Sequence, residues 1–171
     1  MKTTLKITSL LIVLFCVAFS AQAQKFGYIN SNAILAEMPL VKQADATLEA
    51  LQKQLQKKGQ GMVEQFQKDY AAVQQKVERG ELSPKQQEEE AKKLETAQAD
   101  IQKFEQEMVQ QLQTKRNELM DPILKSVNDA IQAIAKEGGF QFIFDEAVLL
   151  YKDTSMDVTA QVKAKLGIAT P

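Results

Sequence analysis

The chain has 171 residues, of which 44 % are hydrophobic and 25 % charged, and its 21 Lys and Arg against 22 Asp and Glu give a net charge of −1. These proportions are those of a globular protein, and the charge balance does not favour a nucleic-acid partner. The sequence has no His and a single Cys, Cys16, which excludes imidazole catalysis, His-ligated metal sites and disulfides within the chain. We therefore expect a non-enzymatic protein with no catalytic residues, no metal and no cofactor.

The first 23 residues predict a cleavable export signal. Positive residues precede an apolar run at 7–19, and the small–x–small tripeptide at 21–23 is the pattern that signal peptidase requires. The alternative is a membrane anchor, but the apolar run is shorter than the roughly 20 residues of a membrane-spanning helix. We predict cleavage after Ala23, which also removes Cys16. The exported chain then has no transmembrane segment, and the bacterial periplasm is its expected location.

The exported chain opens with a predicted strand, Phe26 to Ile29. Asn30 or Ser31 can cap a short helical turn that follows. Pro39 then suits the first turn of a long helix, which we expect to end at Arg79.

In that helix the apolar residues follow a heptad pattern, and the residues between them are mostly Lys, Glu and Gln. A stripe this narrow can bury only one seam. Gly59 and Gly61 interrupt the helix at its middle, where each costs about 1 kcal/mol relative to Ala. They are either tolerated, exposed positions or a flexible point at which the helix bends.

A hairpin tip is predicted at Gly80, Ser83 and Pro84. Gly80 suits the left-handed residue after a helix, and Ser83 with Gln86 forms a capping box around Pro84 at the first helical position. A loop this short returns the second helix antiparallel to the first. The second helix continues to Gly138, with a bend expected near Pro122.

After Gly139 the periodicity changes. Residues 140–144 and 148–151 predict two strands separated by a turn at 145–146, and Asp157 or Thr159 caps a last helix. Three short strands from opposite ends of the chain leave unpaired edges, which favours pairing between copies of the chain.

The whole pattern resembles the Skp/OmpH family of periplasmic chaperones. The resemblance rests on the opening Phe26–Asn30, on Ile34 and Leu35 followed by Pro39, on the Lys/Glu/Gln-rich hairpin and, above all, on 142–151 followed by Asp157–Thr159. It implies a mostly helical α+β fold. Residues 24–39 and 120–171 would form the β-containing oligomerisation body, a small barrel built by three chains. Residues 40–119 would form a coiled-coil hairpin, or tentacle.

The resemblance also implies a homotrimer that holds unfolded outer-membrane β-barrel proteins between its tentacles without ATP. The candidate residues of the oligomerisation body are Phe26, Tyr28, Ile29, Phe142, Ile143, Phe144, Val148 and Leu150. The rings of Phe140, Phe142 and Phe144 either fill a barrel core, which the burial habits of Phe favour, or form an apolar groove. An alternative function is a structural or adaptor coiled coil of the cell envelope.

The candidate client-binding residues are large, adaptable apolar side chains of the hairpin. Methionine repacks easily and aromatic rings bury a large area, which suits many weak, reversible contacts. The candidates are Met62, Phe66, Tyr70, Phe104 and Met108. The same residues could instead close the seam between the two helices, which is the commoner role of heptad positions. The acidic run 88–90 is interpreted as a solvated helix face rather than a cation site.

Overall fold

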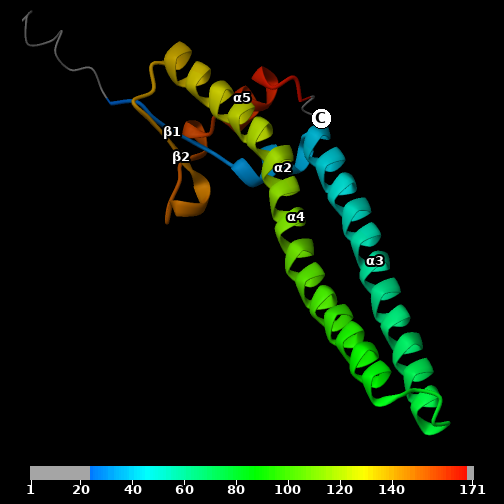
Figure 1. Ribbon diagram of the computed structural model, residues 1–171. Helices are drawn as coiled ribbons and strands as arrows, with labels where there is room; N and C mark the ends of the chain where they lie inside the picture. Colours follow the sequence, from blue (N-terminus) through cyan, green and yellow to red (C-terminus); the bar gives the residue numbers. More distant parts are fainter. Residues whose placement is uncertain (1–23, 169–171) are drawn as a thin grey trace, which may run out of the picture. The chain divides into compact units, whose positions relative to one another are not determined.

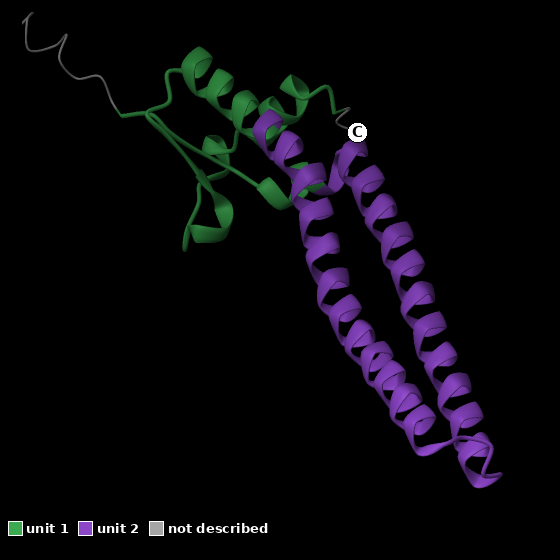
Figure 2. Cartoon of the chain, viewed as in Figure 1, with its two compact units in different colours: residues 1–35, 127–171 green, residues 36–126 purple. Residues whose placement is uncertain are grey.

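The computed structural model describes residues 24–168, so the predicted signal at 1–23 lies outside the described residues, as do 169–171. The chain divides into two compact units, residues 1–35 with 127–171 and residues 36–126 (Figure 2). Two long helices and a two-stranded sheet confirm the expected mostly helical α+β fold with a long helical hairpin.

The hairpin consists of α3, Pro39–Glu78, and the first part of α4, Pro84–Gly138, which lie side by side (Figure 1). As predicted, α3 begins at Pro39, whose missing N–H needs no partner at a helix start. Helix α4 continues through Pro122 without an interruption in its helical assignment. The bend expected there stays a prediction.

The tip has the predicted chemistry. Gly80 has a φ of 69°, and the following Glu81 N–H donates to the Lys76 carbonyl at 2.9 Å, which ends α3 with a left-handed cap. The capping box also forms: the Ser83 N–H donates to Gln86 Oε1 at 2.9 Å, and the Gln86 N–H reaches Ser83 Oγ at 3.4 Å.

The other unit contains a parallel two-stranded sheet of β1, Phe26–Ile29, and β2, Phe142–Asp145, in which Phe26 lies opposite Phe142. On the other side of β1, the Val158 N–H donates to the Tyr28 carbonyl at 2.9 Å. Strand β1 is therefore flanked on both sides by the C-terminal part of the chain.

The second predicted strand of this region, 148–151, is wrong for the described structure. The chain turns into the short 3₁₀ helix η1, Glu146–Val148, because the Asp145 carboxylate accepts a hydrogen bond from the Ala147 N–H at 2.9 Å. Leu149 to Tyr151 then form no strand and pair with no strand among residues 24–168. The pattern that indicated a strand was a run of apolar residues, which shows burial somewhere but not the partner that buries it.

Strand β2 also begins later than predicted, at Phe142 rather than Phe140. The Phe140 N–H donates to the Ala135 carbonyl at 2.9 Å, and its ring folds back over Gly138. A Cβ at Gly138 would lie 2.4 Å from that ring, so the glycine makes room for it. The Lys25 ammonium covers the ring at 4.2 Å from its centroid.

Three short helices complete this unit: α2, Ser31–Glu37; η2, Thr154–Met156; and α5, Thr159–Lys165. Asn30 caps α2, because its Oδ1 accepts from the Ala33 N–H at 2.7 Å. The core of the unit is made of apolar side chains from β1, α2, the end of α4 and α5. They are Tyr28, Ile29, Ile34, Val127, Ala130, Ile134, Val158 and Val162.

Candidate functional site

The five predicted client-binding residues occupy different environments in the hairpin. Phe104 is only 5 % exposed, whereas Tyr70 is 48 % exposed. Met62, Phe66 and Met108 lie between these extremes, each half-buried. Phe104 therefore packs in the seam between the two helices, the alternative given above. The other four residues present apolar surface to solvent.

In the seam, Phe104 of α4 meets Gly59 of α3. A Cβ at Gly59 would lie 3.3 Å from the Phe104 ring, so the glycine lets the ring approach the helix backbone. The Lys58 ammonium lies 4.7 Å from the centre of that ring. Nothing lies within 4 Å of a Cβ placed at Gly61, so of the two glycines only Gly61 is a simple exposed position. The predicted flexibility of this segment stays a prediction.

Beside this contact the hairpin carries a groove of about 820 Å³. We call it the seam groove, and both helices line it. Its apolar lining is Leu55, Gly59, Val63, Ile101, Phe104 and Met108. Its polar lining is Gln56, Gln60, Glu64, Gln67 and Glu105. The groove has the size of a ligand-binding cleft, roughly 300–1,000 Å³, and an apolar side chain could enter it.

Further apolar surface follows the hairpin toward its tip. Phe66 and Tyr70 stack on one face of α3 with their ring centres 6.2 Å apart. Val63 and Val77 of the same helix are exposed, and so is Val109 of α4. The hairpin therefore has exposed apolar surface that a partner could contact.

The predicted oligomerisation residues divide into a buried and an exposed set. Tyr28 and Ile29 are core residues, 3 % and 4 % exposed. Phe26, Phe142 and Phe144 form a partly exposed aromatic cluster, with ring centres 6.0 Å apart for Phe26–Phe142 and 6.1 Å for Phe142–Phe144.

More exposed apolar surface lies next to this cluster in sequence. Ile143 is half-buried, whereas Leu150 is fully open to solvent and Tyr151 and Val148 are mostly exposed. Within one chain, the outward side chains of β2 and of the loop after it therefore remain exposed.

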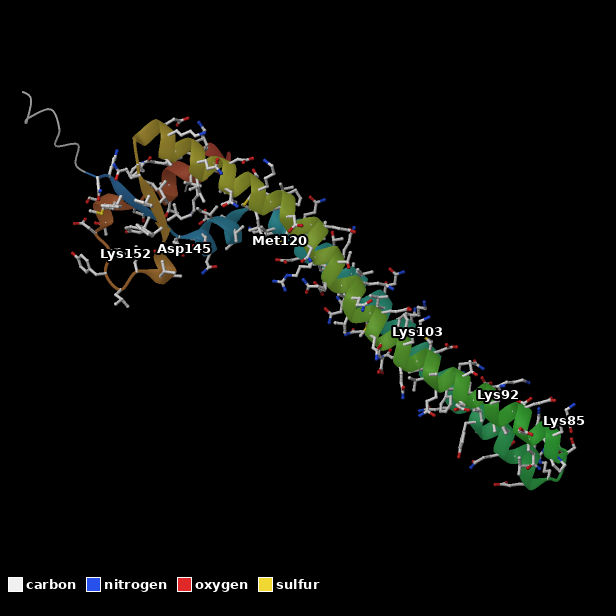
Figure 3. All side chains as sticks on the ribbon, turned by 60° about the vertical axis from the view of Figure 1, so that its left-hand side comes forward. Lys85, Lys92, Lys103, Met120, Asp145 and Lys152 are labelled. Carbon is white, nitrogen blue, oxygen red and sulfur yellow. The ribbon has the colours of Figure 1, made fainter. Side chains whose placement is uncertain are left out.

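A polar cluster holds that exposed segment in place. The Glu146 carboxylate accepts hydrogen bonds from the Asn30 amide and the Lys152 ammonium. Hydrogen bonds from Ser31 and the Ala147 N–H hold the pKa of the Asp145 carboxyl below its ordinary value of 3.8. The hydrogen bond to Glu146 raises the pKa of Lys152. Asp145 and Lys152 flank the exposed apolar loop in sequence (Figure 3).

Sequence reasoning gave Asn30 a role only as a helix cap and did not find this cluster. Asn30 also donates through its backbone N–H to Thr159 Oγ1 at 2.9 Å. Glu146 and Thr159 both lie more than 100 positions after Asn30 in the sequence, and no spacing rule connects residues so far apart. The only signal was that polar residues flank an apolar run.

Among the described residues, no helix combines the length and apolar character that crossing a membrane requires.

Comparison with known proteins places this chain among OmpH-like proteins. A family model described as "Outer membrane protein (OmpH-like)" matches residues 25–166. The chaperone protein Skp of Yersinia enterocolitica is 29 % identical over 152 residues, covering 84 % of this chain and 86 % of that protein. An uncharacterised protein of Aquifex aeolicus is 26 % identical over 161 residues, covering 94 % and 95 % of the two chains. The crystal structure of an OmpH-like protein from Caulobacter crescentus has the same fold, with a TM-score of 0.72 at 16 % identity, over 86 % of each chain.

Proposed function

Because the chain belongs to the OmpH-like outer membrane protein family, we propose that it is a periplasmic chaperone that holds unfolded outer-membrane β-barrel proteins without ATP. The relative named Skp is itself described as a chaperone protein. The observation that carries the proposal is the unburied apolar surface of the hairpin. Tyr70, Val77 and Val109 are exposed among the charged and polar residues of the helix pair.

This surface suits a holding function. Each exposed side chain offers a small contact, and several such contacts along one arm give avidity while each remains weak enough to release. Methionine and aromatic residues adapt to client segments of different shape. The polar residues between them keep the loaded arm soluble. We therefore assign client contacts to Met62, Phe66, Tyr70 and Met108.

We further propose that the chain acts as a homotrimer. Two features support burial against other copies, because such surfaces aggregate when left open. They are the partly exposed cluster of Phe26, Phe142 and Phe144 and the outer edge of β2, which pairs with no strand among the described residues. In this assignment residues 24–39 and 120–171 form the oligomerisation body, and residues 40–119 form the client-holding arm.

The test is whether the exported chain, residues 24–171, keeps a client soluble. A urea-unfolded outer-membrane β-barrel protein is diluted into buffer without nucleotide, and its aggregation is followed by light scattering. We expect scattering to fall in proportion to added chaperone and to be unchanged by ATP. A client that aggregates equally fast with and without the protein would contradict the proposal and favour an envelope spacer.

A matched pair of variants links the activity to the apolar surface. Phe66→Ser with Tyr70→Ser removes the stacked rings, whereas Gln54→Ser with Gln65→Ser changes exposed polar positions on the same helix. We expect the first pair to weaken suppression of aggregation severalfold and the second to leave it unchanged.

A further inference from the structure

The two faces of the hairpin at the Gly59–Phe104 contact carry different charges. Lys58 and Lys103 directly precede these two residues, whereas Gln60 and Glu105 directly follow them. Successive helical residues are about 100° apart. In two antiparallel helices packed through this contact, the preceding positions therefore point to one face and the following positions to the other.

The contacts agree with this geometry. The Lys58 ammonium lies over the Phe104 ring on the first face. The seam groove lies on the second face, and its lining includes Gln60 and Glu105 but neither lysine. Lys92 and Lys85 follow Lys103 toward the hairpin tip at spacings that keep them on one side of α4 (Figure 3).

The groove thus combines an apolar floor with uncompensated negative charge. Phe104 and Leu55 form its most buried part, and Glu64 of α3 and Glu105 of α4 stand on its two walls. Within the part of the chain that the structure describes, no Lys or Arg lines it. Among the residues that the structure describes, neither of these carboxylates is in a salt bridge, whereas other glutamates of the hairpin, such as Glu49 and Glu107, are paired with lysines.

From this arrangement we propose that the seam groove binds a cationic apolar segment of an unfolded polypeptide. An aromatic or aliphatic side chain of the segment enters between Val63 and Met108. A Lys or Arg next to it in the client pairs with Glu64 or Glu105. The inference rests on the proposed client-holding function and adds which part of a client is recognised. The positive charge comes from the client because the groove has none of its own.

The test measures charge preference with two short, fluorescein-labelled peptides of equal length. One alternates Phe and Leu with Lys, and the other has Glu in place of every Lys. Fluorescence anisotropy with the exported chain gives their affinities. We expect the Lys peptide to bind about fivefold more tightly, since two exposed ion pairs contribute about that much. The preference should fall below about twofold at roughly 0.5 M salt, where such pairs are screened.

Two pairs of variants test whether the preference for the Lys peptide arises at the seam groove. Glu64→Gln with Glu105→Gln should abolish it, and Glu88→Gln with Glu89→Gln makes the same charge change outside the groove and should retain it. Because the only cysteine of the sequence lies at position 16, a dye can be placed uniquely at Gln67→Cys on the groove. We expect the Lys peptide to change the emission of that dye and not of one at Gln54→Cys, which does not line the groove.

The outcomes separate this inference from the proposed function. Equal affinities for the two peptides, or equal losses in both glutamate pairs, would overturn the groove assignment while client holding by the aggregation assay still stands. A chain that binds neither peptide and leaves the β-barrel client to precipitate would overturn both.

Discussion

Gly59 and Gly61 show how two identical residues, two positions apart, have different roles. At Gly59 the absent Cβ allows Phe104 to reach the backbone of α3, whereas Gly61 faces open space. From the sequence, the two glycines were interpreted either as exposed positions or as a flexible point of the helix. It could not show the close contact, because that depends on which residue of the other helix comes opposite.

Replacing these glycines by alanine should separate the two roles. Gly61→Ala should raise the free energy of unfolding by about 0.5–1 kcal/mol, since alanine favours the helix and meets no neighbour. Gly59→Ala should raise the free energy of unfolding by less than half as much, because its Cβ would lie 3.3 Å from the Phe104 ring. Urea titration followed by circular dichroism at fixed protein concentration measures both. Equal gains would contradict the assigned contact.

Asp145 predicts a pH dependence of stability. Its carboxyl pKa is lowered below 3.8 by hydrogen bonds from Ser31 and Ala147, so the folded state favours the ionised form. The stabilisation is complete above the unfolded-state pKa and is lost as the pH falls through the lower, folded-state pKa. We expect the urea concentration at the unfolding midpoint to drop as the pH falls below about 4. In Asp145→Asn this midpoint should drop less steeply with pH. Asp100→Asn, on the exposed part of α4, serves as the control. If the midpoint of Asp145→Asn fell with pH as steeply as that of the unchanged protein, the stabilising role of the Asp145 carboxylate would be contradicted.

At the scale of elements, the helices were the most predictable part of the chain. Their caps are local: Pro39 at the start of α3, Gly80 after its end, and Ser83 with Gln86 at the start of α4 lie within a few residues of what they control. Strand β1 was predicted from its run of apolar residues, and it has a partner in β2. The strand predicted at 148–151 failed because a strand needs a partner, and the described residues do not supply one.

The candidate site was predictable in composition but not in geometry. The heptad pattern identified Phe104 and Met108 as apolar hairpin residues, yet it could not rank their burial, which depends on Gly59. The carboxylates of the seam groove, Glu64 and Glu105, carry no motif. They become a pair only when α3 and α4 come together.

The exposed aromatic cluster of β1 and β2 predicts how the chain assembles. Phe142 is 56 % exposed, so Phe142→Asp should leave the fold of one chain intact but prevent copies from burying this face. We expect the mass from light scattering to fall from three copies to one, with the helical circular dichroism signal unchanged. Val109→Asp, at an exposed apolar position of the hairpin, is the control and should stay trimeric. An unchanged mass for Phe142→Asp would contradict the assignment of this face to the body.

At the scale of the whole molecule, the two units present different kinds of surface, one suited to assembly and the other to holding a client. The sheet unit presents aromatic rings and an unpaired strand edge, which suit contact with identical copies. The hairpin unit presents scattered apolar side chains among charges, which suit contact with many different segments. We therefore propose that client holding belongs to an assembly of several chains.

The most direct test of this account is the mass of the complex with a client. The exported chain is mixed with a urea-unfolded outer-membrane β-barrel protein as the urea is diluted, without ATP. The soluble material is then separated by size-exclusion chromatography with light scattering. The account predicts a soluble species with the mass of three copies of the chain and one client. A client that precipitates while the protein elutes alone would contradict it.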